Sequence, residues 1–237
     1  HNEVDDFVQG KGQYTSDIDL SEQLYACFVR SPHASAVIRK IDSKVALAIP
    51  GVKLVLTGED LAKAGVGQIM PMAIFNGIDG KPMTQAGIPV LAYPQVRYVG
   101  EAVVAVAAET LDIARAALAV IHVEYEELPS LFDPHEAMKD GAIQLHDFAQ
   151  NNICKHTRIR KGDVDTALAQ ADIIVEQTYN TQSIEHAYLE PEAGLAYLEA
   201  DGCVTVQSPS QNITHHRHML ARILGRPINK VRMIMST

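Results

Sequence analysis

Residues 101–126, EAVVAVAAETLDIARAALAVIHVEYE, contain the clearest succession of secondary-structure signals in the chain. The run from Glu101 to Ala108 is apolar almost throughout, which is typical of a strand buried on both faces. Thr110 is a favourable N-cap for a helix over residues 111–120, and residues 122–126 then alternate as a half-exposed strand. A strand, a helix and a strand in quick succession predict a βαβ-like unit within a mixed α/β domain.

Shorter signals of the same two kinds precede this stretch. Strands are expected at residues 23–30, 36–41 and 53–57, and helices at 43–48 and 59–64. Residues 65–90 are rich in Gly and Pro and predict an extended loop, longer than most connections in a compact domain. Gly65-Val66-Gly67 lacks a preceding long strand and a third Gly, so we interpret it as part of that loop and not as a dinucleotide fingerprint.

Periodicity disappears between residues 141 and 160, and we place a domain boundary near residue 150. The chain is therefore expected to be an α+β protein with domains at 1–150 and 151–237. In the second domain we expect a short helix ending at Gln170, a strand over Ile173–Thr181, and two strands flanking a hairpin at Asp201-Gly202. A helix over 208–224 and a final strand from Val231 follow.

The predicted helix over residues 208–224 has clear end signals. Ser208-Pro209-Ser210-Gln211 matches a capping box, with Ser208 as the N-cap and Gln211 at the third helical position. Gly225 follows the last turn and Pro227 prevents its continuation.

Charge excludes one large class of function. Residues 1–150 hold 20 Asp and Glu against 11 Lys and Arg, whereas residues 151–237 hold nine of each, and the whole chain carries a formal charge of −9. A nucleic-acid-binding protein needs a basic surface, because neutralising phosphates supplies most of its affinity. We therefore expect no nucleic-acid partner.

Cysteine content and hydropathy bear on location. Three cysteines without a C-x-x-C pair predict neither a disulfide framework nor a zinc ribbon. The longest apolar run has seven residues, against about 20 for a membrane-spanning helix, and no charged-then-apolar leader opens the sequence. We expect a cytoplasmic protein with no membrane partner.

Three clusters of titratable residues could support chemistry, and each is better explained structurally. His215, His216 and His218 do not share one helix face with a carboxylate or Cys, so a polar face is favoured over a metal site. The second cluster, Glu185, His186, Glu190 and Glu192, alternates between the two faces of an extended segment. The third cluster, Glu124, Glu126 and Glu127, lies at a strand end, where solvent exposure is the expected state. We predict no metal ligands and no complete catalytic set in the chain.

Longer segments carry a family resemblance. In order, they are GKGQYTSDIDL, LYACFVRSPHASAVIRKID, PGVKLVLTGEDL, QVRYVGEAVVAVAAET and VEYEELPSLFDPHEAM. Together they resemble the small α/β hammerhead domain of the xanthine dehydrogenase and aldehyde oxidase family of molybdenum hydroxylases. GDVDTALAQADIIVE, EHAYLEPEAGLAYLE, VTVQSPSQ and LARILGRPINKVRMI resemble the opening of that family's molybdopterin-binding domain. The resemblance covers residues 10–235.

The resemblance implies one cofactor-binding residue. A Gln that closes the S-x-Q segment in such enzymes lies beside the molybdenum and hydrogen-bonds its oxo group, and here that position is Gln211. A neutral amide donates a hydrogen bond without adding a charge that would shift the metal's redox balance. The predicted capping box would engage the same amide, so the two roles compete.

The resemblance also implies what the complete enzyme needs. The glycine-rich segment that cradles the pterin, the Arg that orients substrate and the Glu that acts as general base are absent from residues 1–237. We therefore expect this polypeptide alone to bind no molybdopterin and to hydroxylate nothing, and its partners to be the remaining molybdopterin-binding segment and modules carrying FAD and [2Fe-2S] clusters. Together they would hydroxylate a purine, aldehyde or N-heterocycle. The alternative is a non-catalytic module that docks other subunits.

Overall fold

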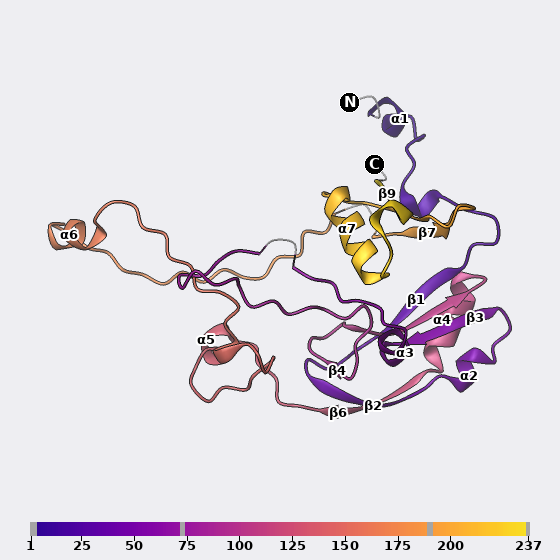
Figure 1. Cartoon of the computed structure of the whole chain (residues 1–237), viewed down its shortest axis with the longest axis horizontal. Coiled ribbons are helices and arrows are strands. Elements are labelled where there is room, and N and C mark those ends of the chain that lie inside the picture. The colour runs from indigo at the N-terminus through magenta and orange to yellow at the C-terminus, as the bar shows by residue number, and fades with distance from the viewer. Residues whose placement is uncertain (1–3, 72–73, 189–191, 236–237) are drawn as a thin grey trace.

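The computed structural model describes residues 4–71, 74–188 and 192–235, and its strands form three separate three-stranded sheets (Figure 1). In sheet order, the strands are β1 (Tyr25–Arg30), β5 (Ala102–Ala108) and β3 (Val52–Thr57); β4 (Gln95–Val96), β2 (Ala36–Asp42) and β6 (His122–Glu127); and β7 (Leu195–Leu198), β8 (Val204–Ser208) and β9 (Val231–Met235). The helices are α1 (Val4–Val8), α2 (Lys44–Leu47), α3 (Gly58–Lys63), α4 (Leu111–Ala119), α5 (Pro134–Ala137), α6 (Val164–Ala169) and α7 (Ile213–Ile223), with short 3-10 turns at Thr15–Asp17, Gln150–Asn152 and Ile228–Lys230.

Strand β5 forms the centre of the first sheet. It pairs antiparallel with β1 on one side and β3 on the other. Val103, Val104 and Val106 are fully buried, which confirms the predicted doubly covered strand. Helix α4 begins where expected, because the Thr110 hydroxyl accepts a hydrogen bond from the Ile113 amide at 3.2 Å.

The predicted βαβ unit around α4 is wrong. Strand β6 pairs with β2, in a different sheet from β5. Both edges of β5 are already occupied by β1 and β3, so β6 cannot join it. The side chains of β5 and β6 instead pack face to face, with Val103 and Val104 contributing to one apolar cluster with Val123 and Tyr125.

A βαβ unit does occur near the C-terminal end of the described chain. Strands β8 and β9 are parallel, and α7 is the crossover between them. Strand β7 adds to β8 through the predicted hairpin, in which Gly202 adopts a φ of +80°. Arg217 fixes α7 to the sheet: its Nε donates to the Val231 carbonyl at 2.7 Å and its Nη2 to the Ile228 carbonyl at 2.8 Å.

The strand predicted over Ile173–Thr181 does not form. Every residue from 156 to 188 is exposed, and α6 lies at the far end of this extended segment (Figure 1). A strand requires a neighbour for its ladder, and no described residue pairs with this stretch. We call residues 156–188 the arm.

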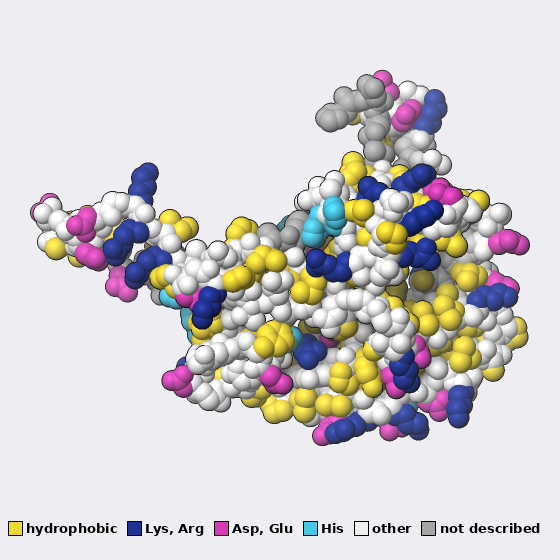
Figure 2. Space-filling view, viewed as in Figure 1, with side chains coloured by type: hydrophobic (Ala, Val, Ile, Leu, Met, Phe, Trp, Pro, Cys, Tyr) yellow, Lys and Arg dark blue, Asp and Glu magenta, His cyan; other side chains and the backbone are white. Residues whose placement is uncertain are grey.

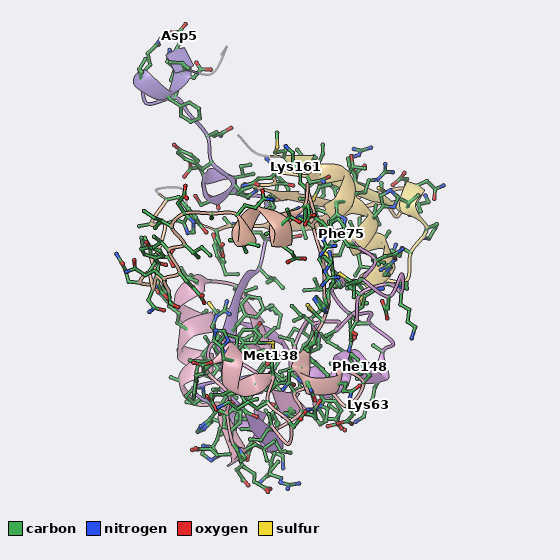
Figure 3. The ribbon with its side chains drawn as sticks, turned by 90° about the vertical axis from the view of Figure 1, so that its left-hand side faces the viewer. Asp5, Lys63, Phe75, Met138, Phe148 and Lys161 are labelled. Carbon is green, nitrogen blue, oxygen red and sulfur yellow. The ribbon has the colours of Figure 1, made fainter. Side chains whose placement is uncertain are left out.

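The long loop is present as predicted, and part of it follows the base of the arm. The Ile78 amide donates to the His156 carbonyl and the Thr84 amide to the Cys154 carbonyl, each at 2.8 Å. The Lys155 ammonium lies 4.4 Å from the centroid of the Phe75 ring, which Figure 3 labels. No helix among the described residues has the length and apolar character needed to cross a membrane.

Candidate functional site

The loop between β8 and α7 carries Gln211, and its structure differs from the predicted capping box. Strand β8 continues through Ser208, which pairs with Met235, so Ser208 is extended and does not cap a helix. The helix begins four residues later, where the Asn212 side-chain oxygen accepts a hydrogen bond from the His215 amide at 3.0 Å. Gln211 therefore precedes the helix and has no capping role.

Two side chains hold this loop in place. The Ser210 hydroxyl accepts a hydrogen bond from the Asn212 amide at 3.1 Å and lies 2.9 Å from Nδ1 of His216, in the first turn of α7. The residues on either side of Gln211 are thus fixed to the helix, while its own amide makes no hydrogen bond with another described residue. An exposed amide on a braced loop is available to a ligand.

Gln211 borders a groove of about 770 Å³ between the first sheet and the loop. Phe28 and Arg30 line the groove from β1. The opposite wall comes from the segment ahead of β7, from the end of β8 with the loop that follows it, and from α7. That opposite wall is formed by Tyr188, residues 192–194, residues 208–212 and His216. The groove is thus built by two parts of the chain that are distant in sequence.

Arg30 is oriented by the turn that leads into β5 and ends at Gly100. Its Nη1 donates to the Gly100 carbonyl at 2.9 Å, and its guanidinium lies 5.9 Å from the centroid of the Phe28 ring. The adjacent Glu101 is only 3% exposed, and its carboxylate accepts a hydrogen bond from the Arg97 amide at 2.6 Å. Burial raises the pKa of the Glu101 carboxyl, although the Arg97 amide and guanidinium act in the opposite direction.

The other end of α7 is capped by the long loop. The Gly67 amide donates a hydrogen bond to the Ile223 carbonyl at 2.8 Å, one of the terminal carbonyls without a partner inside the helix. A Cβ at Gly67 would lie 3.1 Å from both the Arg222 carbonyl oxygen and the Ile223 Cα, so any side chain here would force the loop and the helix apart by a few tenths of an ångström. The Gly65-Val66-Gly67 segment is a loop as interpreted, and it anchors α7.

The three titratable clusters have separate surroundings. Glu124, Glu126 and Glu127 are exposed. Glu124 and Glu126 of β6 pair with Lys40 and Arg39 of β2, and Glu127 lies beside His33, which precedes β2. Glu185 and Glu192 are exposed, and Glu190 lies outside the described residues. Histidine side chains gather over α7 (Figure 2), but only His216 lines the groove. No three His, Cys, Asp or Glu side chains converge as metal ligands in the described parts of the chain.

Two family models match the chain, one on each of the two parts that form the groove. Residues 9–129 match the model of the aldehyde oxidase and xanthine dehydrogenase a/b hammerhead domain, and residues 145–237 match the molybdopterin cofactor-binding domain. The chain belongs to the aldehyde oxidase and xanthine dehydrogenase family. The β1 wall of the groove lies in the first match, and the Gln211 loop lies in the second.

Individual relatives agree with this assignment. The chain is 34% identical over 235 residues to the nicotinate dehydrogenase large molybdopterin subunit of Eubacterium barkeri, covering 97% of this chain and 50% of the relative. It is 34% identical over 229 residues to a probable xanthine dehydrogenase subunit of Bacillus subtilis, and the match covers 97% of this chain and 29% of that relative. The chain thus spans half of the first relative's length and less than a third of the second's.

Solved structures share the fold over almost the whole chain. Quinoline 2-oxidoreductase from Pseudomonas putida 86 superposes with a TM-score of 0.87 at 27% identity, covering 99% of this chain and 29% of that one. Aldehyde oxidoreductase from Desulfovibrio gigas superposes with a TM-score of 0.84 at 25% identity, and the match covers 99% of this chain and 26% of that one.

Proposed function

We propose that this chain is part of the molybdenum-binding subunit of a hydroxylase that acts on a purine, an aldehyde or an N-heterocycle. The substrate's C–H bond is replaced by a C–O bond whose oxygen comes from water, with release of two protons and two electrons. When bound, the molybdenum cofactor supplies the redox centre that takes up these electrons. The electrons leave through partner modules that carry [2Fe-2S] clusters and FAD.

We propose the division into domains at 1–150 and 151–237, with the second forming the first portion of the molybdopterin-binding domain. The separation of the third sheet from the first two supports this division. Since the chain spans only 29–50% of the Bacillus and Eubacterium relatives, we expect the rest of the cofactor pocket to come from polypeptide outside residues 1–237.

Gln211 is the proposed cofactor-binding residue. The single observation that carries this role is its position: an exposed amide, outside the helix and free of capping, on the wall of a groove. The amide N–H donates to the cofactor and leaves the local charge unchanged. Ser210 and His216 restrict the loop, so the donor stays in place without reorganising during the reaction.

The reaction class is tested with the complete subunit and its partners. Metal analysis should find molybdenum, and turnover of purine, aldehyde and N-heterocycle candidates in ¹⁸O-labelled water should place the label in the product. A product oxygen that comes from O₂ would contradict the proposal. A complete complex with neither molybdenum nor turnover would favour the docking-module alternative.

The role of Gln211 is tested with Gln211→Ala in the same complex. Removing one preorganised donor should lower kcat by roughly 100-fold while molybdenum content stays at the wild-type level. His218→Ala is the matched control, because His218 is exposed on α7 and does not line the groove. Full turnover by the Gln211→Ala complex would remove the residue from the site.

A further inference from the structure

Glu101 is the one acidic residue in the described part of the chain that is buried, with 3% of its surface exposed. Its carboxylate accepts a hydrogen bond from the Arg97 amide at 2.6 Å, and its own amide donates to the Tyr98 carbonyl at 3.3 Å. The side chain and the backbone of Glu101 thus close the turn over residues 97–100. Further polypeptide around this turn can only cover the carboxylate more, so its burial is a property of the turn itself.

The turn is tied to the end of β1 by three hydrogen bonds. The Gly100 amide donates to the Ser31 carbonyl at 2.8 Å, and the Ser31 amide donates to the Glu101 carbonyl at 2.9 Å. The third bond runs from Nη1 of Arg30 to the Gly100 carbonyl at 2.9 Å. Gly100 adopts a φ of +91°, a conformation that residues with a side chain rarely take. The position of the Arg30 side chain therefore depends on the shape of the turn.

The pairing of β1 with β5 is irregular at the same point. Val29 pairs with Val104 whereas Arg30 pairs with Ala102, which makes Val103 an extra residue on β5. A bulge of this kind changes the direction of nearby side chains and is common next to active sites. The bulge and the turn together direct Arg30.

Arg30 lines the groove from the wall opposite Gln211. A guanidinium has five N–H donors, of which the Gly100 carbonyl takes one, and Arg30 forms no other hydrogen bond or ion pair with a described residue. Holding so long a side chain in one position costs rotamer entropy. The turn imposes this restriction before any ligand arrives, so a ligand that binds Arg30 does not have to supply it.

We propose that Glu101 is a positioning residue for the hydroxylation: its buried carboxylate closes the turn over residues 97–100, and the turn holds the Arg30 guanidinium at the groove. Glu101 does not line the groove and acts through Arg30. Arg30 then presents positive charge and N–H donors, already oriented, to acceptor atoms of the bound substrate. The inference rests on the proposed function for the reaction that takes place in the groove.

A double-mutant cycle in the complete complex tests this route. We would measure kcat/KM per bound molybdenum for wild type, Glu101→Ala, Arg30→Ala and the double variant, with whichever purine, aldehyde or N-heterocycle the wild-type complex turns over. Each single variant should lower kcat/KM by roughly 10-fold, the effect of losing one hydrogen bond from a charged donor. The double variant should be no worse than Arg30→Ala, because Glu101 then has nothing left to position.

Two results of the cycle would overturn the proposal. Glu101→Ala could leave kcat/KM unchanged. Alternatively, it could lower kcat/KM by the same factor whether or not Arg30 is present, which would make Glu101 a structural residue that acts independently of Arg30.

Three further variants separate positioning from folding. Glu101→Gln retains an oxygen that accepts the Arg97 amide, so kcat/KM should stay within about twofold of wild type. Gly100→Ala strains the turn at a φ of +91° and leaves Glu101 in place, so it should reproduce the loss even if Glu101→Ala fails to fold. Glu109→Ala is the matched control and should leave kcat/KM unchanged, because Glu109 is exposed at the other end of β5 and pairs with Lys53. Full activity of Gly100→Ala, or a loss in Glu101→Gln as large as in Glu101→Ala, would also overturn the proposal.

The positioning can be tested without turnover. In crystal structures of the complex, the Arg30 guanidinium should leave the Gly100 carbonyl in Glu101→Ala and stay beside it in Glu101→Gln. A complex that holds no molybdenum and hydroxylates nothing overturns the proposed function, whatever the position of Arg30. An active complex in which Arg30 keeps its hydrogen bond in Glu101→Ala overturns the positioning role alone.

Discussion

Replacing Gly67 with Ala should loosen the attachment of α7 to the first half of the chain. The new methyl group would stand 3.1 Å from the Arg222 carbonyl oxygen and the Ile223 Cα. Both are backbone atoms of a helical turn, so they cannot move without disturbing α7, and the loop must withdraw instead. Withdrawal lengthens the 2.8 Å hydrogen bond from residue 67 to the Ile223 carbonyl.

The size of this effect follows from two terms. Overpacking costs about 1–3 kcal/mol, and loss of the hydrogen bond costs about 0.5–1.5 kcal/mol. Together the two terms predict a loss of roughly 1.5–4.5 kcal/mol of unfolding free energy in urea denaturation. We also expect faster amide exchange at residue 67. The matched control is Gly194→Ala, because a methyl group at Gly194 would have no described atom within 4 Å and the residue has no positive φ.

Two outcomes would refute this reasoning. Gly67→Ala could unfold within about 0.5 kcal/mol of wild type, the range of ordinary surface substitutions. Alternatively, residue 67 could keep its amide protection despite the methyl group. Either result would mean that the contact between the Gly67 loop and α7 adapts and does not fix the helix.

Three further substitutions test other parts of the structure. Thr110→Ala should cost about 1 kcal/mol of stability by removing the N-cap of α4, while Thr110→Ser should retain it. Burial raises the pKa of the Glu101 carboxyl, so ionising this group costs more free energy in the folded protein than in the unfolded chain, and the cost is fully present once the pH exceeds the folded pKa. Glu101→Gln should therefore stabilise the protein more at pH 8 than at pH 4. An equal effect at both pH values would contradict the raised pKa. Ser210→Ala should cost about 1 kcal/mol and shift the NMR resonances of the His216 ring, whereas unshifted resonances would show that the hydroxyl does not hold that ring.

Local patterns predicted the elements whose determinants lie within a few residues. The apolar run of β5, the Thr110 cap and the Asp201-Gly202 hairpin are all present where expected. Pairing between strands was less predictable, because it depends on which edges are free. The βαβ unit was assigned around α4, but β8, α7 and β9 form it instead.

The helix start near Gln211 shows how a local pattern can mislead. Both Ser208 and Asn212 are good N-caps, and the capping-box pattern favours the first. Parallel pairing of β8 with β9 extends the strand through Ser208 and leaves Asn212 as the cap. The signal that could have found the true cap is Ser210, whose spacing to Asn212 is typical of a side-chain turn.

The groove itself could not be derived from local patterns. Phe28 and Arg30 lie on the exposed face of β1, as alternate residues of many half-exposed strands do. Nothing in the neighbouring sequence indicates that a distant loop lies opposite them. Gln211 came from the family resemblance, which identified the residue without its surroundings. The contact of Gly67 with α7 joins segments far apart in the chain, and no local rule predicts it.

The Gln211 loop and helix α7, which follows it, lie next to the first half of the chain at both of their ends. Ahead of α7, the loop faces the β1 wall across the groove, and at the other end Gly67 caps the helix. A rotation of one half against the other would break the cap and change the groove together. In the proposed hydroxylase complex, Gly67→Ala should therefore lower kcat while molybdenum content is retained, because the proposed donor Gln211 is displaced but still present. Wild-type kcat in a variant whose helix cap is demonstrably lost would show that the groove is set by its own loop and not by the hammerhead domain.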